Sequence, residues 1–148
     1  LSKMDLLYVS APIIGYLGAG TIKFFLNSIK SGRWAFKDVG MGSMPSTHNT
    51  ITSTSFFVLG FGEGFSSPIC GVALALMIIV AIDSLDLREK IEGHAKVLYK
   101  NFSDTNPEAA KLRLRLSHTP TEVLGGITLG AIIAYSMLTI LPFVGFLA

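Results

Sequence analysis

Two short segments of the chain carry histidines beside residues that suit proton transfer or nucleophilic chemistry. In the first, His48 follows Pro45, Ser46 and Thr47. This pattern predicts the start of a helix, whose free N–H groups and dipole favour an anion. A histidine in the first helical turn could donate or accept a proton there. The alternative interpretation is that the segment is simply a capped helix start.

In the second segment, His118 and Glu122 are four residues apart. At that spacing a carboxylate can reach the imidazole and fix its tautomer, which is a recurring arrangement for an activated nucleophile or base. Thr119-x-x-Glu122, with Pro120 at the first helical position, also fits a capping box, so Glu122 has a purely structural interpretation as well. Two ionisable groups at the edge of a membrane span nevertheless indicate a functional site, because they are costly there.

The elements that position these residues follow from the distribution of charge. Only 15% of the 148 residues are charged, against about 25% in soluble domains. Four windows without Asp, Glu, Lys or Arg run to 17, 24, 19 and 26 residues, and a membrane helix needs about 20 apolar residues. The sequence therefore predicts an all-α integral membrane bundle, with residues 1–148 as one membrane domain and spans at 5–29, 46–62, 67–84 and 120–147. A nucleic-acid binder, a disulfide scaffold and a disordered chain are excluded.

The basic residues predict how the bundle is oriented. Segments 30–45 and 83–118 carry ten of the twelve Lys and Arg residues. By the positive-inside rule both segments are cytoplasmic, both termini face outward, and both histidine motifs lie at the cytoplasmic face of the cell's inner or plasma membrane. We expect segment 85–118 to form one or two amphipathic helices at the membrane surface. The supporting signals are the i,i+4 pairs Asp86–Lys90 and Glu92–Lys96 and a helix start at Asn106-Pro107.

Small and charged residues also occur inside or at the ends of the predicted spans. Gly126 with Gly130, and Gly71 with Ala75, have the spacing that lets membrane helices approach closely. Lys23 lies within the first span, where it would bind a ligand, pair with an acid or extend to the interface. Asp83 ends the third span and Arg88 follows five residues later, which suggests a local salt bridge.

The two histidine segments resemble motifs of the type 2 phosphatidic acid phosphatase superfamily. Residues 45–48 resemble its Pro-Ser-Gly-His motif, and Arg113 with His118-x-x-x-Glu122 resembles its Ser-Arg…His-x-x-x-Asp motif. The chain is more similar to a divergent branch related to acid phosphatases and vanadium-dependent haloperoxidases. That branch reads Gly-Gly-Met-Pro-Ser-Ser-His and Gly-His-Thr-Pro-x-Glu-Val, where this chain reads Gly-Ser-Met-Pro-Ser-Thr-His at 42–48 and Ser-His-Thr-Pro-Thr-Glu-Val at 117–123. The resemblance covers about residues 20–130, in the same order.

This resemblance implies roles for individual residues. His118 would attack phosphorus, Glu122 would orient His118, and His48 would protonate the leaving oxygen, without a metal or other cofactor. The phosphate oxygens would be held by basic side chains and by the helix start, with Asp83 orienting one of the cations; the implied phosphate-binding residues are Lys23, Arg88, Arg113, Ser46 and Thr47. The superfamily's first motif, Lys-x6-Arg-Pro, reads Lys23-x6-Lys30-Ser31 here, and Arg113 is one residue nearer His118 than usual.

The implied function is a membrane phosphatase or phosphotransferase that hydrolyses a lipid phosphate or diphosphate through a phosphohistidine. Its partners would be that lipid and the surrounding membrane, without nucleic acid, and a homo-oligomer is a further expectation because four spans form a thin bundle beside the superfamily's usual six. A non-catalytic lipid-phosphate-binding or scaffold protein is the main alternative. Asp83-x-x-Asp86 also suggests a CDP-alcohol phosphotransferase, but that family's second aspartate motif is absent. Haloperoxidase activity would require bound vanadate.

Overall fold

The computed structural model describes residues 3–34 and 44–143, and this part of the chain is helical with no strand. The long helices are α1 (Lys3–Ser31), α2 (Thr47–Glu63), α3 (Pro68–Ile82), α4 (Arg88–Phe102) and α6 (Pro120–Phe143). A π-helical turn, η2 (Asp83–Leu87), joins α3 to α4, and α5 (Pro107–Ala110) is a single short turn. Residues 37 and 40–43, which belong to the basic segment and to the first histidine motif, lie outside the described residues.

Helices occur at all four predicted spans, but only three are long and apolar enough to cross a membrane. These three are Met4–Ser31, Pro68–Phe102 and Pro120–Ile140. The remaining helix, α2, has 17 residues, and its buried side chains are mainly polar, among them Asn49, Thr50, Ser53 and Thr54. The structure therefore has the helices that an integral membrane protein requires, while the expected count of four spans is not confirmed.

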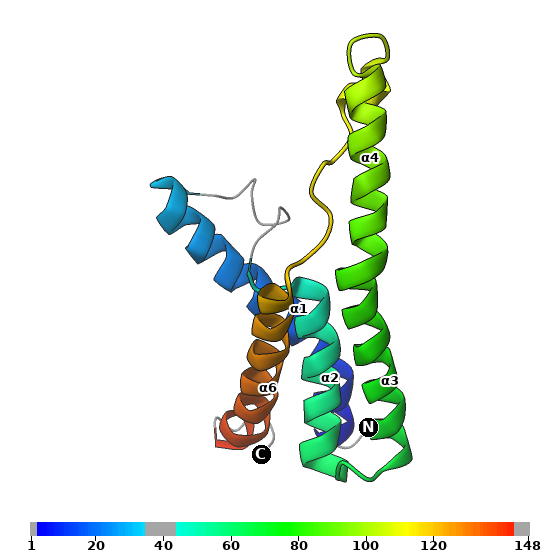
Figure 1. The fold of residues 1–148 in the computed structure, drawn as a ribbon. Coiled ribbons are helices and arrows are strands. Elements are labelled where there is room, and N and C mark those ends of the chain that lie inside the picture. The colour runs from blue at the N-terminus through cyan, green and yellow to red at the C-terminus, as the bar shows by residue number, and fades with distance from the viewer. Residues whose placement is uncertain (1–2, 35–43, 144–148) are drawn as a thin grey trace.

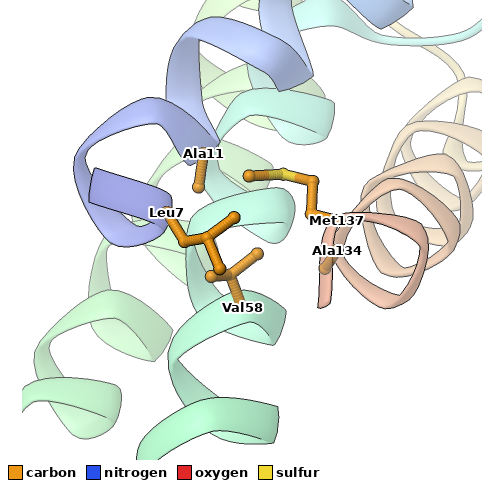
Figure 2. Close-up of a cluster of buried hydrophobic side chains, with 5 residues drawn as sticks. All are labelled: Leu7, Ala11, Val58, Ala134 and Met137. Carbon is orange, nitrogen blue, oxygen red and sulfur yellow. The ribbon is translucent and has the colours of Figure 1, made fainter. Parts of the chain in front are cut away.

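The short helix α2 lies at the centre of the bundle and packs against α1, α3 and α6 (Figure 1). Apolar side chains from three of these helices meet in a small core (Figure 2). Leu7 and Ala11 come from α1, Val58 from α2, and Ala134 and Met137 from α6. Because α2 is covered by its neighbours, its polar side chains are shielded from lipid.

Glycines allow α6 to approach α2 closely, as the Gly126 and Gly130 spacing predicts. A Cβ at Gly126 would lie 2.6 Å from the carbonyl oxygen of Ser46, and one at Gly130 would overlap the hydroxyl of Ser53. The hydroxyl of Ser53, which faces Gly130, is satisfied within α2, where it donates to the carbonyl of Asn49 at 2.5 Å. Gly71 differs, because a Cβ there would meet nothing within 4 Å. Its predicted role in close helix packing is not seen among the residues that the structure describes.

The third predicted span does not end in a bend at Asp83. Instead, α3, η2 and α4 form one helix of 35 residues, and in Figure 1 α4 continues in the direction of α3 beyond the rest of the bundle. The expectation of helices lying across the membrane surface is therefore not confirmed. The ion pairs Asp86–Lys90 at 2.8 Å and Glu92–Lys96 at 2.6 Å do form, as predicted.

The chain returns from the far end of α4 to the bundle without regular structure. Asn106 caps α5 by accepting a hydrogen bond from the N–H of Glu108 at 2.9 Å, which confirms the predicted helix start. Residues 112–119 then run as an irregular strap to the start of α6. In Figure 1 this segment descends beside α4, while α1 begins and α6 ends at the opposite end of the molecule. The orientation of these two ends across a membrane stays a prediction.

Candidate functional site

Glu122 contacts both His118 and the cap of α6. One carboxylate oxygen, Oε2, lies 3.0 Å from His118 Nδ1 and also accepts the N–H of Thr119 at 3.1 Å. The N–H of Glu122 donates in return to the Thr119 hydroxyl at 3.3 Å, which completes the capping box. The structural and the chemical interpretations of Glu122 are thus compatible. A proton on Nδ1 would leave the Nε2 lone pair of His118 available for chemistry.

The second carboxylate oxygen of Glu122 binds a residue that the sequence analysis did not single out. Arg115 Nη2 donates to Oε1 of Glu122 at 2.9 Å. The sequence signal for Arg115 is its spacing of two residues from Arg113 and from Ser117. In an extended chain, residues two apart face the same side. Arg113, Arg115 and Ser117 follow this period and line one cavity, to which Leu116 and His118 also contribute.

A buried polar network fixes the backbone on which both histidines stand. The side-chain amide of Asn49 donates to the hydroxyls of Ser46 at 2.9 Å and Ser84 at 3.1 Å. The carbonyl of Ser84 accepts the N–H of His118 at 3.1 Å, and the N–H of Ser46 donates to the carbonyl of Glu122 at 3.1 Å. The network therefore joins the start of α2, the turn η2 and the start of α6.

The buried network also determines the place of Ser46. This residue is fully buried, and its hydroxyl is occupied by Asn49. It does not line the cavity described below, whereas its neighbours Thr47 and His48 do. Asn49 and Ser84 carry no sequence signal for this role, since neither belongs to a recognisable motif.

A cavity of about 130 Å³ brings together most of the predicted site residues. It is smaller than the roughly 300–1,000 Å³ of sites for drug-sized ligands, so it suits a small polar group. Its polar lining consists of two histidines, two hydroxyl side chains and four cations: His48, His118, Thr47, Ser117, Lys23, Arg88, Arg113 and Arg115. Segments 24 to 95 residues apart in the sequence thus converge on one cationic pocket.

Two of the four cations pair with an acid, and the described residues provide no acidic partner for the other two. Arg88 Nε donates to Asp83 at 2.7 Å, a contact across the π turn, and Arg115 pairs with Glu122. Lys23 is only 4% exposed, and no carboxylate of the described residues forms an ion pair with it. A buried charge is normally paired, so the free ammonium of Lys23 suits an anionic ligand. The guanidinium of Arg113, which is exposed, adds a second cation to the same cavity.

The donor set does not suggest a bound cation. No group of three or more His, Cys, Asp or Glu side chains with metal-binding geometry occurs in residues 3–34 and 44–143. Glu122 and Asp83, the acids next to the cavity, are each occupied by an arginine. The electrostatic character of the cavity is therefore that of an anion site.

Comparison with known proteins supports the resemblance of the two motifs. No curated protein and no solved structure matches the chain. The sequence model of the Divergent PAP2 family, a branch of the type 2 phosphatidic acid phosphatases, matches residues 5–133. This range includes nearly all of α1, the whole of α2 to α5, both histidine motifs and the first half of α6. The chain therefore belongs to the Divergent PAP2 family.

Proposed function

We propose that this protein is a membrane-embedded phosphatase or phosphotransferase that acts on a lipid phosphate or diphosphate through a phosphohistidine. The observation that carries the proposal is the 130 Å³ cavity lined by His48, His118 and four cations. Phosphoryl transfer requires an in-line nucleophile and positive charge around the equatorial oxygens. A cavity lined by a histidine with a carboxylate partner and by four cations supports this assignment. Membership of a branch of the phosphatidic acid phosphatases supports the same reaction class.

In the first half of the reaction, Nε2 of His118 attacks phosphorus. An N–P bond forms as the bond between phosphorus and the leaving oxygen breaks, and His48 transfers its proton to that oxygen. The negative charge of Glu122 stabilises the imidazolium that develops on His118, as a carboxylate does in a catalytic triad. Lys23, Arg88 and Arg113 bind the equatorial oxygens.

In the second half, water attacks phosphorus while His48 accepts a proton from it. The N–P bond breaks, phosphate leaves, and His118 regains its lone pair. An alcohol in place of water would give a phosphotransferase by the same steps. All groups used here are side chains of the cavity or of its immediate partners, so the mechanism needs no bound metal.

The substrate is proposed to be a lipid that reaches the site from the cytoplasmic leaflet. The cavity lies where the strap meets the starts of α2 and α6, and the basic segments 30–45 and 83–118 flank these starts in the sequence. Basic residues at that position attract anionic head groups. The chain is expected to reside in the cell's inner or plasma membrane.

A non-catalytic lipid-phosphate-binding or scaffold protein is the second candidate, and the first family motif favours it. Lys30, which stands where the superfamily has Arg, is exposed and does not line the cavity. Such a protein would bind phosphate or vanadate in the cavity without turnover. The two candidates therefore make opposite predictions for product release.

The test is phosphate release from phosphatidic acid in detergent micelles, with a chelator present. We expect the wild-type protein to release phosphate, His118→Ala to release none above background, and His48→Ala to be slower by about 10²–10⁴-fold, the usual contribution of general acid–base catalysis. His94→Ala is the matched control, because His94 is an exposed histidine of α4 outside the cavity. Vanadate binding without release of phosphate by any of these proteins would favour the non-catalytic alternative.

A further inference from the structure

Glu92 of α4 is bound to the strap immediately before His118. Its side chain is 12% exposed. Oε2 accepts the N–H of Leu116 at 2.9 Å, the N–H of Ser117 at 3.1 Å and the hydroxyl of Ser117 at 2.7 Å. Oε1 accepts Lys96 Nζ at 2.6 Å. One charged side chain thus binds two consecutive residues next to the proposed nucleophile.

Besides Glu92, the strap is held near this point by the ion pair of Arg115 with Glu122 and by the hydrogen bond from the N–H of His118 to the carbonyl of Ser84. Residues 112–119 form no helix or strand. On the side of the strap that faces α4 lies a second cavity, of about 590 Å³, lined by residues of both segments, including Glu92, Ser117 and His118. Side-chain packing therefore does not fill the space behind Ser117, and hydrogen bonds must fix the backbone there. Hydrogen bonds to an ionised acceptor are the strong ones.

The same face of α4 carries a cation of the phosphate cavity. Arg88 lies one helical turn before Glu92, at the i,i+4 spacing that places two residues on one face. A fixed distance between α4 and the strap therefore also fixes Arg88 relative to His118. The part of α4 that continues beyond the bundle therefore supports the strap.

We propose that Glu92 is a positioning residue for the phosphoryl-transfer reaction, acting through Leu116 and Ser117 to hold His118 toward the phosphate cavity. The inference rests on the proposed function. The competing interpretation is that Glu92 only stabilises α4 through its i,i+4 pair with Lys96. The chain offers a control for that pair, because Asp86–Lys90 is an exposed i,i+4 pair on the same helix.

The first experiment measures kcat and KM for phosphatidic acid in detergent micelles, per folded molecule, for Glu92→Ala, Glu92→Gln and Asp86→Asn. Glu92→Ala is expected to lower kcat by about 100-fold with little change in KM, since small displacements of a reacting group have effects of that size. Glu92→Gln should restore part of kcat, because its amide oxygen can still accept from the strap. Asp86→Asn should match the wild type. Equal kcat for Glu92→Ala and the wild type would overturn the proposal.

The second experiment does not depend on turnover. Diethylpyrocarbonate modifies histidines, and peptide mass spectrometry separates His118 from His94, the exposed histidine of α4. Glu92→Ala should change the rate at which His118 is modified, several-fold and toward faster modification, while His94 and the Asp86→Asn variant stay at wild-type rates. An unchanged His118 rate in Glu92→Ala would contradict the positioning role. If the wild type releases no phosphate, the proposed function fails, and this measurement still decides whether Glu92 positions His118.

Discussion

At the scale of single residues, Glu122 illustrates how one carboxylate can serve a helix cap and a catalytic histidine at once. Both the N–H of Thr119 and Nδ1 of His118 lie within hydrogen-bonding distance of the same oxygen, while the other oxygen binds Arg115. A cap needs only an acceptor, whereas an imidazolium needs a negative charge to stabilise it. The two roles can therefore be separated by substitution.

Glu122→Gln is expected to lower kcat by at least about 100-fold, since losing the charged partner of a catalytic histidine has large effects, with a small change in stability. Thr119→Ala is the matched variant: it removes the other half of the capping box and should cost about 1 kcal/mol of stability while kcat is retained. Thermal unfolding and steady-state kinetics check both. Full activity in Glu122→Gln would contradict the catalytic role and show that Glu122 serves only in the helix cap.

For Lys23 we expect two opposing effects. Its ammonium favours the binding of an anion and lowers the stability of the unliganded protein. Its ammonium is buried, and no carboxylate of the described residues pairs with it. We expect Lys23→Met to raise the unfolding temperature of the unliganded protein, because a buried unpaired charge is unfavourable. The same variant should weaken vanadate binding by about 10-fold or more, as for a lost hydrogen bond to a charged group. A lower unfolding temperature would indicate that Lys23 has a structural partner instead.

The site contacts that the sequence predicts join residues that lie close together along the chain. Others, which it does not predict, are formed only by the packing of distant helices. The dyad of His118 and Glu122 follows from a four-residue spacing, and helix geometry converts that spacing directly into a contact. Asn49 and Ser84 are 35 residues apart, and their contact depends on how α2 packs beside η2. No periodicity in the sequence encodes that packing.

At the scale of elements, the contact between α2 and α6 decides where the two histidine motifs lie. Gly126 packs against the carbonyl of Ser46, two residues before His48, and lies four residues after Glu122. The backbone of the first motif therefore rests on α6 itself. The position of the start of α2 therefore depends on its close contact with α6.

Gly126→Ala and Gly71→Ala form a matched pair that tests this contact. A Cβ at position 126 would overlap backbone, so we expect destabilisation of about 1–3 kcal/mol, as for other overpacked sites, together with a loss of activity. At position 71 the Cβ meets nothing, and alanine should stabilise the helix by roughly 0.5–1 kcal/mol. Thermal unfolding of both variants is the measurement. Equal effects at the two positions would contradict the packing described here.

The π turn shows where the structure departs from the predicted elements. The charge that begins at Asp83 marks the end of an apolar span and suggested a separate surface helix. In the structure the helix continues, and the wider turn brings Arg88 Nε within 2.7 Å of Asp83 five residues earlier. Charge patterns report where a helix leaves the apolar layer, but they do not report whether its axis bends there.

At the scale of the whole molecule, the two ends of the bundle differ in how many basic residues they carry. The turn between α2 and α3, the beginning of α1 and the end of α6 share one end (Figure 1). The strap and the phosphate cavity lie toward the other, with α4 beyond them. The positive-inside rule predicts that the cavity end faces the cytoplasm.

Single cysteines test that orientation. With the native Cys70 replaced by alanine, Ser66→Cys in the turn after α2 should react with an impermeant thiol reagent in intact cells, and Asp104→Cys after α4 should not. Both positions are exposed, so access depends on the side of the membrane. Permeabilised cells are the control, in which both should react. Labelling of position 104 alone in intact cells would reverse the topology and place the cavity on the outer side.

The central claim is that His118 becomes phosphorylated, and trapping the intermediate tests it most directly. Protein mixed with phosphatidic acid labelled in its phosphate is quenched with base within one turnover, digested and analysed by mass spectrometry. We predict an acid-labile, base-stable phosphoryl group on His118, absent in His118→Ala and unchanged in the His94→Ala control. Release of phosphate without any label on His118, or with the label on another residue, would contradict the account.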